Sequence, residues 1–183
     1  MKKILLLLHP GCEEIEAVTP LDLLRRAGLT VTAAAVGPDL RVIGGRGIAL
    51  TADALLSDCA DQAYDMLVIP GGPGVEALRK RPEVLELARN FHGQNRYIAA
   101  ICAAPLVLLD AGLLAGRAVT SFPAEEEALR NHVGAYTSER VQVDGKLITA
   151  RGAGVSEEFS LTLIRVLLGP EKAGEVRQRI VAR

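Results

Sequence analysis

Four short apolar runs, none alternating with polar residues, constrain the fold of this chain more than any other feature. They occupy residues 4–8, 31–36, 66–69 and 97–101. Such runs are typical of strands that are covered on both faces, as in a parallel sheet. Between them the apolar residues follow a helical period, for example over residues 15–24, before Gly28 ends the segment. The alternation predicts a flavodoxin-like α/β fold, in which helices sandwich a doubly wound, mostly parallel sheet.

Further helices are predicted over about residues 75–91, with an interruption near Pro82, over 103–112 and over 155–168, and a last helix begins at Pro170. Two glycine-containing segments, 41–50 and 140–149, instead predict hairpins. The first is expected beside the main sheet. The chain carries no internal repeat, low-complexity tract or Pro/Ser-rich linker, so we expect one domain over residues 1–183.

Charge and cysteine content limit the classes of partner. A formal net charge of −1 gives no basic surplus for nucleic acid. Cys12, Cys59 and Cys102 have no C-x-x-C spacing and the three histidines no metal-ligand spacing, so we predict no disulfide framework, no metal and no cofactor. Reduced thiols fit the cytoplasm.

The first apolar run is too short for a signal peptide, and no run approaches the ~18 residues that span a membrane.

The stretch AAICAAPLVLL, residues 99–109, places Cys102 between a predicted strand and a predicted helix with Pro105 in its first turn. Free amides at a helix N-terminus favour a thiolate, so we expect the pKa of Cys102 to fall from about 8.5 into the range of roughly 3.5 to 7.5. Small neighbours, including Ala103, suit a sharp strand-to-helix elbow. Cys102 is therefore a candidate nucleophile, and the alternative is a buried structural cysteine.

Gly71 and Gly72 follow the predicted strand 66–69 and belong to the same expected sheet edge. Adjacent glycines allow backbone N–H groups to approach a ligand. With the amide of Ala103 they could form an oxyanion hole, and the alternative is an ordinary tight turn.

Three carboxylates, Glu13, Glu14 and Glu16, open the first predicted helix. The helix dipole explains Glu13 and Glu14. We expect Glu16 to point inward, to be partly buried with a raised pKa, and to move a proton. Cys12 in the same loop is a resolving thiol or an incidental small residue.

Six separated motifs resemble the DJ-one/ThiJ/PfpI superfamily, in particular its DJ-one-like branch, which includes the Parkinson-associated protein deglycase and bacterial relatives. They are GCEEIEA (11–17), DLLRRAG (22–28), YDMLVIPGG (64–72), AAICAAP (99–105), AGLLAGRAVT (111–120) and DGKLITARG (144–152). The resemblance covers nearly the whole chain.

The resemblance implies roles for individual residues. Cys102 matches the reactive, readily oxidised nucleophile, Glu16 the glutamate that contacts its sulfur, and Glu13 a second carboxylate of the pocket. Gly72 and the amide of Ala103 match the oxyanion donors. The resemblance further implies a homodimer, in which Arg46 approaches the active site of the partner subunit.

Two departures from family patterns narrow the chemistry. The residue after the cysteine is Ala103, where the peptidase-like branch has histidine, so no base adjoins the thiol and peptidase activity is disfavoured. Phe122 stands where some relatives carry a pocket histidine, and it cannot transfer protons. Chemistry must therefore rest on Cys102 and Glu16.

The resemblance implies a cofactor-free glyoxalase III-type hydro-lyase or protein deglycase that acts on 2-oxoaldehydes such as methylglyoxal and glyoxal. Cys102 would form a hemithioacetal, and the product would be a hydroxy acid. The alternative is an oxidation-sensing stress-response protein or chaperone that uses the same cysteine.

Overall fold

A seven-stranded sheet forms the centre of the computed structural model, which describes residues 2–182. The strand order is β10-β11-β7-β6-β1-β2-β5. The strands are β1 (Lys3–Leu8), β2 (Thr30–Ala35), β5 (Ala54–Leu55), β6 (Met66–Ile69), β7 (Tyr97–Ile101), β10 (Val141–Asp144) and β11 (Leu147–Ala150). Every neighbouring pair is parallel except β10 with β11. The predicted doubly wound, mostly parallel sheet is confirmed.

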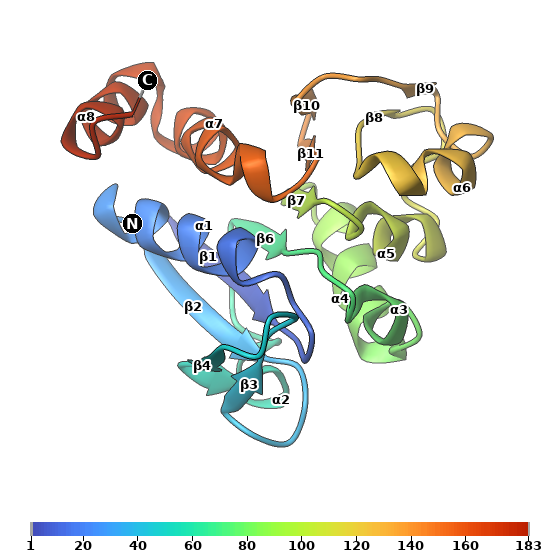
Figure 1. The fold of residues 1–183 in the computed structure, drawn as a ribbon, viewed down its shortest axis with the longest axis horizontal. Helices are drawn as coiled ribbons and strands as arrows, with labels where there is room; N and C mark the ends of the chain where they lie inside the picture. The colour runs from blue at the N-terminus through green and yellow to red at the C-terminus, as the bar shows by residue number, and fades with distance from the viewer. Residues whose placement is uncertain (1, 183) are drawn as a thin grey trace.

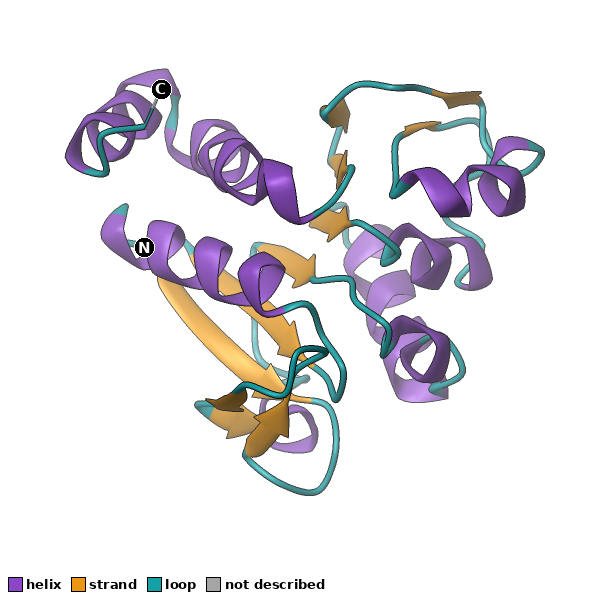
Figure 2. Cartoon of the chain, viewed as in Figure 1, coloured by secondary structure: helices purple, strands orange, loops and turns teal. Residues whose placement is uncertain are grey.

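Helices cover both faces of this sheet (Figure 1). They are α1 (Glu14–Arg26), α2 (Leu56–Cys59), α3 (Val75–Leu78), α4 (Pro82–Gly93), α5 (Pro105–Asp110), α6 (Glu126–Arg130), α7 (Ser156–Leu168) and α8 (Pro170–Arg179), with short 3-10 turns at Pro123–Glu125 and Ala153–Val155. Two small two-stranded sheets lie outside the main one (Figure 2): β3 (Arg41–Ile43) with β4 (Ala49–Thr51), and β8 (Ala118–Val119) with β9 (Ala135–Tyr136).

Strand β1 shows why the central runs lack polar alternation. Its side chains point alternately to opposite faces, and each face is covered by helices. Ile4, Leu6 and Leu8 belong to a core shared with α1, α7 and α8, whereas Leu5 and Leu7 belong to a second core shared with α2 to α6. All five side chains are buried, so none of these five positions can be polar without loss of packing, whereas the first residue of the strand, Lys3, is exposed.

The elements match the sequence predictions in their main features. Both predicted hairpins are antiparallel pairs, and Pro82 begins a new helix where the interruption was expected. Several boundaries differ by one or two residues, and two of them are instructive. The second strand begins at Thr30 and ends at Ala35, one residue earlier than predicted. The helix predicted from Ala103 begins at Pro105, because residues 102–104 form the turn that leaves the sheet.

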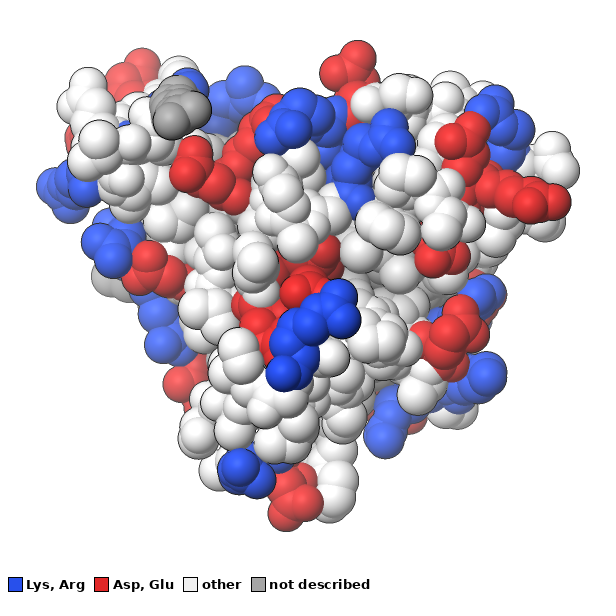
Figure 3. All heavy atoms as spheres, viewed as in Figure 1, with Lys and Arg blue, Asp and Glu red and all other residues white. Residues whose placement is uncertain are grey.

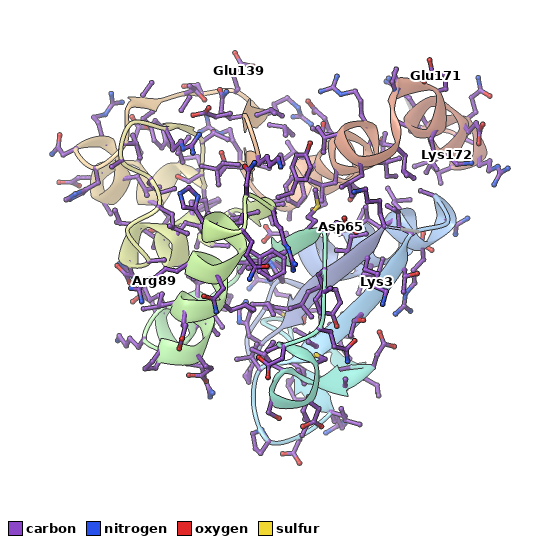
Figure 4. The ribbon with its side chains drawn as sticks, turned by 180° about the vertical axis from the view of Figure 1, so that it is seen from behind. Lys3, Asp65, Arg89, Glu139, Glu171 and Lys172 are labelled. Atoms are coloured by element: carbon purple, nitrogen blue, oxygen red, sulfur yellow. The ribbon has the colours of Figure 1, made fainter. Side chains whose placement is uncertain are left out.

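Charged side chains of both signs are interspersed over the surface in view (Figure 3), in keeping with the net charge of −1. At the amino-terminal edge of the sheet, Asp65 accepts hydrogen bonds from the backbone N–H of Lys3 and from Lys2 Nζ, both at 2.8 Å; Lys3 and Asp65 are labelled in Figure 4. Among the described residues, no helix is both long and apolar enough to cross a membrane.

Candidate active site

Three loops meet at the carboxyl-terminal edge of the sheet: residues 9–13 after β1, 70–74 after β6 and 102–104 after β7. The chain order of the strands reverses between β1 and β6, since β2 lies on one side of β1 and β6 on the other. Open α/β sheets bind ligands outside such a reversal point, because the loops diverge there. The fold therefore brings the three predicted loops together.

Cys102 occupies a strained position in the third of these loops, residues 102–104. Its φ is +63°, a left-handed conformation that costs a residue with a side chain about 1–3 kcal/mol. Two backbone hydrogen bonds hold it there: its N–H donates to Ala150 O, and its carbonyl accepts from Phe122 N, both at 2.9 Å. The conformation turns the half-buried thiol away from the sheet and into the site, as the predicted elbow requires.

Glu16 lies against this thiol and has no exposed surface, so it is more deeply buried than predicted. Its Oε2 accepts a hydrogen bond of 2.9 Å from Gly71 N, whereas its Oε1 is buried beside the Cys102 thiol with no hydrogen-bond partner among the described residues. Burial raises the pKa of Glu16 to about 7, although the Gly71 N–H and the neighbouring Cys102 thiol oppose this. Near neutral pH this carboxyl group can both accept and release a proton, as predicted.

The pKa of Cys102 contradicts the sequence prediction of a thiolate. Burial and the negative charge of Glu16 raise the pKa of the thiol to about 12, while the backbone N–H groups of Ala103 and Gly72 oppose the rise. The expected donors are therefore present, but desolvation and the neighbouring carboxylate outweigh them. The resting group is a thiol that has a base beside it.

The glycine pair is required by close backbone packing. A Cβ on Gly71 would lie 2.6 Å from Cys102 Cβ and 2.8 Å from Glu16 Oε2. Gly72 has a φ of +105°, and a Cβ there would lie 2.4 Å from Glu13 N. All three contacts are closer than any real Cβ allows, so neither position can carry a side chain. Only glycine at both positions lets the Gly72 amide reach the Cys102 sulfur while the Glu16 side chain stays in place.

Arg46 and Glu13 form the charged rim of the site. Arg46 Nη2 lies 3.3 Å from Glu13 Oε2, and the Arg46 side chain is 70% exposed. The buried Glu14 anchors the hairpin that carries Arg46, since its Oε1 accepts hydrogen bonds from Arg46 N at 2.8 Å and Ile48 N at 3.3 Å. Phe122 is 45% exposed and completes the rim as an apolar surface.

Gly152 is a site residue that sequence reasoning missed. A Cβ there would lie 3.5 Å from Phe122 Cδ2, 3.8 Å from Glu16 Oε1 and 3.9 Å from Cys102 Sγ. A glycine thus leaves the space over the sulfur open. The signal was available, since Gly152 follows β11, and β11 pairs in parallel with the strand that precedes Cys102.

His9 and Cys12 lie in the first loop, and both side chains are buried. His9 is buried, with Nε2 3.1 Å from Pro70 O and Nδ1 3.2 Å from Pro10 O, so it braces the two neighbouring loops. Cys12 has no exposed surface, and burial raises its pKa to about 11. Both properties favour the incidental small residue over the resolving thiol.

Fold and site together define an α/β protein whose cysteine stands on a strand-to-helix elbow, with a buried glutamate against its thiol. The chain belongs to the DJ-1/PfpI family, whose family model matches residues 2–166. It is 40% identical over 184 residues to Protein DJ-1 homolog A of Arabidopsis thaliana, covering 100% of this chain and 47% of that protein, so it spans about half the length of that relative.

Two further similarities extend over both partners. Glutathione-independent glyoxalase DJR-1.2 of Caenorhabditis elegans is 33% identical over 176 residues, which are 96% of this chain and 94% of that one. The crystal structure of Drosophila melanogaster DJ-1beta superposes with a TM-score of 0.96 at 37% identity, covering 100% of this chain and 98% of that one.

Proposed function

We propose that this protein is a cofactor-free glyoxalase that converts 2-oxoaldehydes such as methylglyoxal and glyoxal into 2-hydroxy acids. The observation that carries the proposal is the close approach of the Cys102 thiol and the Glu16 carboxyl group, with the N–H groups of Gly72 and Ala103 beside the same sulfur. A nucleophile, a proton carrier and two anion-stabilising donors thus converge on one point. The name of the nematode relative, a glutathione-independent glyoxalase, supports this choice of substrate class.

The reaction follows from the protonation states of the pair. The Glu16 carboxylate takes the thiol proton as the Cys102 sulfur adds to the aldehyde carbon, and the Gly72 and Ala103 N–H groups stabilise the developing oxyanion. Glu16 returns the thiol proton to the oxyanion, which gives a hemithioacetal and restores the carboxylate. Glu16 next moves a proton from the former aldehyde carbon to the adjacent carbon, while the hydroxyl proton of the hemithioacetal passes to the ketone oxygen, so that the first carbon becomes a thioester carbonyl and the ketone becomes an alcohol.

Water then cleaves the thioester, giving the hydroxy acid and the free thiol. One 2-oxoaldehyde and one water give one hydroxy acid, with no external oxidant or reductant. In the deglycase form of the proposal, the Cys102 sulfur replaces the protein thiol, amine or arginine on the carbon of an early aldehyde adduct. The bond to the protein group breaks, that group leaves with the thiol proton carried by Glu16, and the same hemithioacetal then reacts as above. Ala103 stands where a peptidase-like Cys-His pair would need histidine, so peptide hydrolysis remains disfavoured.

Lactate formation from methylglyoxal, without added glutathione, tests the proposal. We expect lactate from the unchanged protein and at least a 100-fold lower rate from Cys102→Ser and from Glu16→Gln, because either change removes a reacting group. Cys59→Ala is the matched control, because Cys59 is buried and belongs to a core outside the site. Lactate no faster than in Cys102→Ser would overturn the assignment.

The same donors also favour a second function, oxidation sensing. Two peroxides could convert the Cys102 thiol to a sulfinic acid, releasing two waters, and the Gly72 and Ala103 amides would bind its oxygens. Mild peroxide should then add two oxygens at Cys102, as seen by intact mass, and Glu16→Leu should reduce this selectivity. An unchanged mass at sub-millimolar peroxide would count against a sensor or a redox-controlled chaperone.

We further propose that two copies of the chain pair through α1 and the β3–β4 hairpin. Apolar side chains are unusually exposed there: Ile15 at 53%, Val18 at 43%, Ile43 at 41% and Ile48 at 55%. Arg46, between Ile43 and Ile48, would then stand at the boundary between two active sites.

The three free thiols favour the cytoplasm as the compartment for both proposed functions.

A further inference from the structure

A cavity of about 210 Å³ lies at the edge of the sheet opposite to the one that carries Cys102. It opens where β7 and β11 begin, and Ile98 and Leu147, which are paired in the register of these two strands, form part of its lining. Cys102 follows the other end of β7, about 16 Å away for a five-residue strand. The cavity is therefore separate from the active site, and no step of the proposed reaction uses it.

Cationic groups from three separate segments line this cavity. Arg96 precedes β7, Arg117 precedes β8, and Lys146 stands in the turn between β10 and β11, while the imidazole of His92 comes from the last turn of α4. None of the described residues that line it is acidic. The cavity therefore offers an anion at least three positive charges gathered from distant parts of the chain.

Acidic neighbours only partly neutralise these cations. Asp144 Oδ1 lies 3.6 Å from Arg117 Nη1, and the other carboxylate oxygen of Asp144 accepts a hydrogen bond from Ala118 N at 2.8 Å. Asp65 lies close enough to Arg96 for the charge of the arginine to contribute to lowering the pKa of Asp65. The Asp65 carboxylate is, however, already bound by Lys2. Lys146 forms no ion pair with a described residue.

The cations are held in place by the surrounding structure. Lys146 Nζ donates to the carbonyl of Asn95 and lies 5.6 Å from the centroid of the Tyr97 ring, and two of its three N–H groups remain for a ligand. Arg96 lies 5.8 Å from the ring centroid of Phe91. Because these groups are already ordered, a ligand would lose less entropy in gathering them.

The size and lining select the ligand. A volume of 210 Å³ equals about seven water molecules at roughly 30 Å³ each, which is below the range of drug-sized pockets. Leu113, Ile98 and Leu147 add an apolar side to the cationic one. Two guanidinium forks and an ammonium group suit the three oxygens of a phosphate, and the apolar side suits a short carbon chain. We propose that this cavity binds a small phosphate monoester.

Calorimetry with glycerol 3-phosphate as the probe tests this site. We expect sub-millimolar binding, at least tenfold weaker binding to Lys146→Gln and to Arg96→Gln, and unchanged binding to Lys172→Gln on α8, which is an exposed lysine outside the cavity. Cys102→Ala should bind as tightly as the unchanged protein. Amide chemical shifts of the unchanged protein should move at residues 95–98, 117 and 145–147.

Several outcomes would overturn the proposal. Glycerol binding as tightly as glycerol 3-phosphate would show that charge is not recognised, and malonate binding equally well would exclude a specific phosphate site. Unaltered affinity in Lys146→Gln and Arg96→Gln, lost affinity in Cys102→Ala, or shifts confined to the residues around Cys102 would each remove the cavity from the explanation. None of these results depends on glyoxalase activity, so the two proposals can fail separately.

Discussion

At the residue scale, the proposed chemistry depends on one proton shared between Cys102 and Glu16. Burial raises the pKa of both groups, to about 12 and about 7 respectively, so the pair at neutral pH is a thiol beside a partly ionised carboxyl group. The nucleophile is then generated during attack and does not exist beforehand as a thiolate. This places the pH dependence of reactivity on Glu16 and gives two predictions.

The first prediction concerns the rate at which iodoacetamide alkylates Cys102. Because the base is the Glu16 carboxylate, the rate should rise about tenfold per pH unit below pH 7 and level off above it. In Glu16→Gln the step near pH 7 should disappear. The measurement is a set of rate constants from pH 5 to 9, with modification located by peptide mass. A profile that keeps rising steadily to pH 9 would show instead that Cys102 ionises independently of Glu16.

The second prediction concerns stability. The pKa of Glu16 is about 7 when folded and 4.5 when exposed, so the folded state binds the proton more tightly and loses stability as pH rises from about 4.5 to 7. The loss approaches about 3 kcal/mol at pH 8 for a group with no exposed surface. Glutamine does not titrate, and its oxygen can still accept the Gly71 hydrogen bond.

We therefore expect Glu16→Gln to unfold at a higher urea concentration than the unchanged protein at pH 8. Its free energy of unfolding should be higher by up to about 3 kcal/mol at pH 8, and this difference should shrink at pH 5. Cys102→Ser serves as a control that leaves the carboxyl group in place. Equal differences at the two pH values would mean that the carboxyl is not desolvated.

The sequence was sufficient to place Cys102, Glu16 and Gly72 near one another. Each of them follows a strand, and the three strands end at one edge of the sheet. The prediction failed on the sign of the Cys102 pKa shift. The helix amides that favour a thiolate are visible as a sequence pattern, whereas the depth of burial and the approach of Glu16 exist only after the 85 intervening residues have folded. Gly152 was missed although it follows a predicted strand, because the pairing of that strand with the one before Cys102 was not predicted.

At the element scale, unalternated apolar runs and glycine turns were sufficient to predict the main strands and both hairpins. The short elements β5, β8, β9, α2 and α6 were not predicted. Strands of two residues and helices of four or five carry too few positions for a period to be detected, and their neighbours determine their conformation. The active site is built from the predictable elements, so the missing ones did not obscure it.

The turn after β6 gives the element-scale prediction. Gly72→Ala would place a Cβ 2.4 Å from Glu13 N and 2.5 Å from Gly11 O at a φ of +105°, and backbone atoms cannot move aside. We expect a loss of at least about 2 kcal/mol in the free energy of unfolding. Gly174→Ala is the matched control, since nothing lies within 4 Å of its added Cβ and helix α8 should gain about 0.5–1 kcal/mol. Urea denaturation of both variants tests the contrast, which fails if Gly72→Ala is as stable as the unchanged protein.

At the scale of the whole molecule, the two edges of the sheet carry different chemistry. The carboxyl-terminal edge holds a thiol and carboxylates, and the amino-terminal edge holds a cluster of cations around a small cavity. A parallel sheet favours this separation, because all strand ends of one kind meet on one side. Strands β7 and β11 run from the cationic edge to the edge that carries the thiol, and the two proposed activities have separate readouts.

The last prediction concerns the assembly of the molecule. If the exposed apolar face of α1 and the β3–β4 hairpin pairs with a second copy, sedimentation velocity should give the mass of two chains. A charge in that face would have to be desolvated on pairing, so Ile48→Glu should sediment as a single chain. Val143→Glu is the matched control, since Val143 is 37% exposed on the edge strand β10 and should leave the pair intact. A single-chain mass for the unchanged protein at micromolar concentration, or a persistent pair in Ile48→Glu, would contradict this interface.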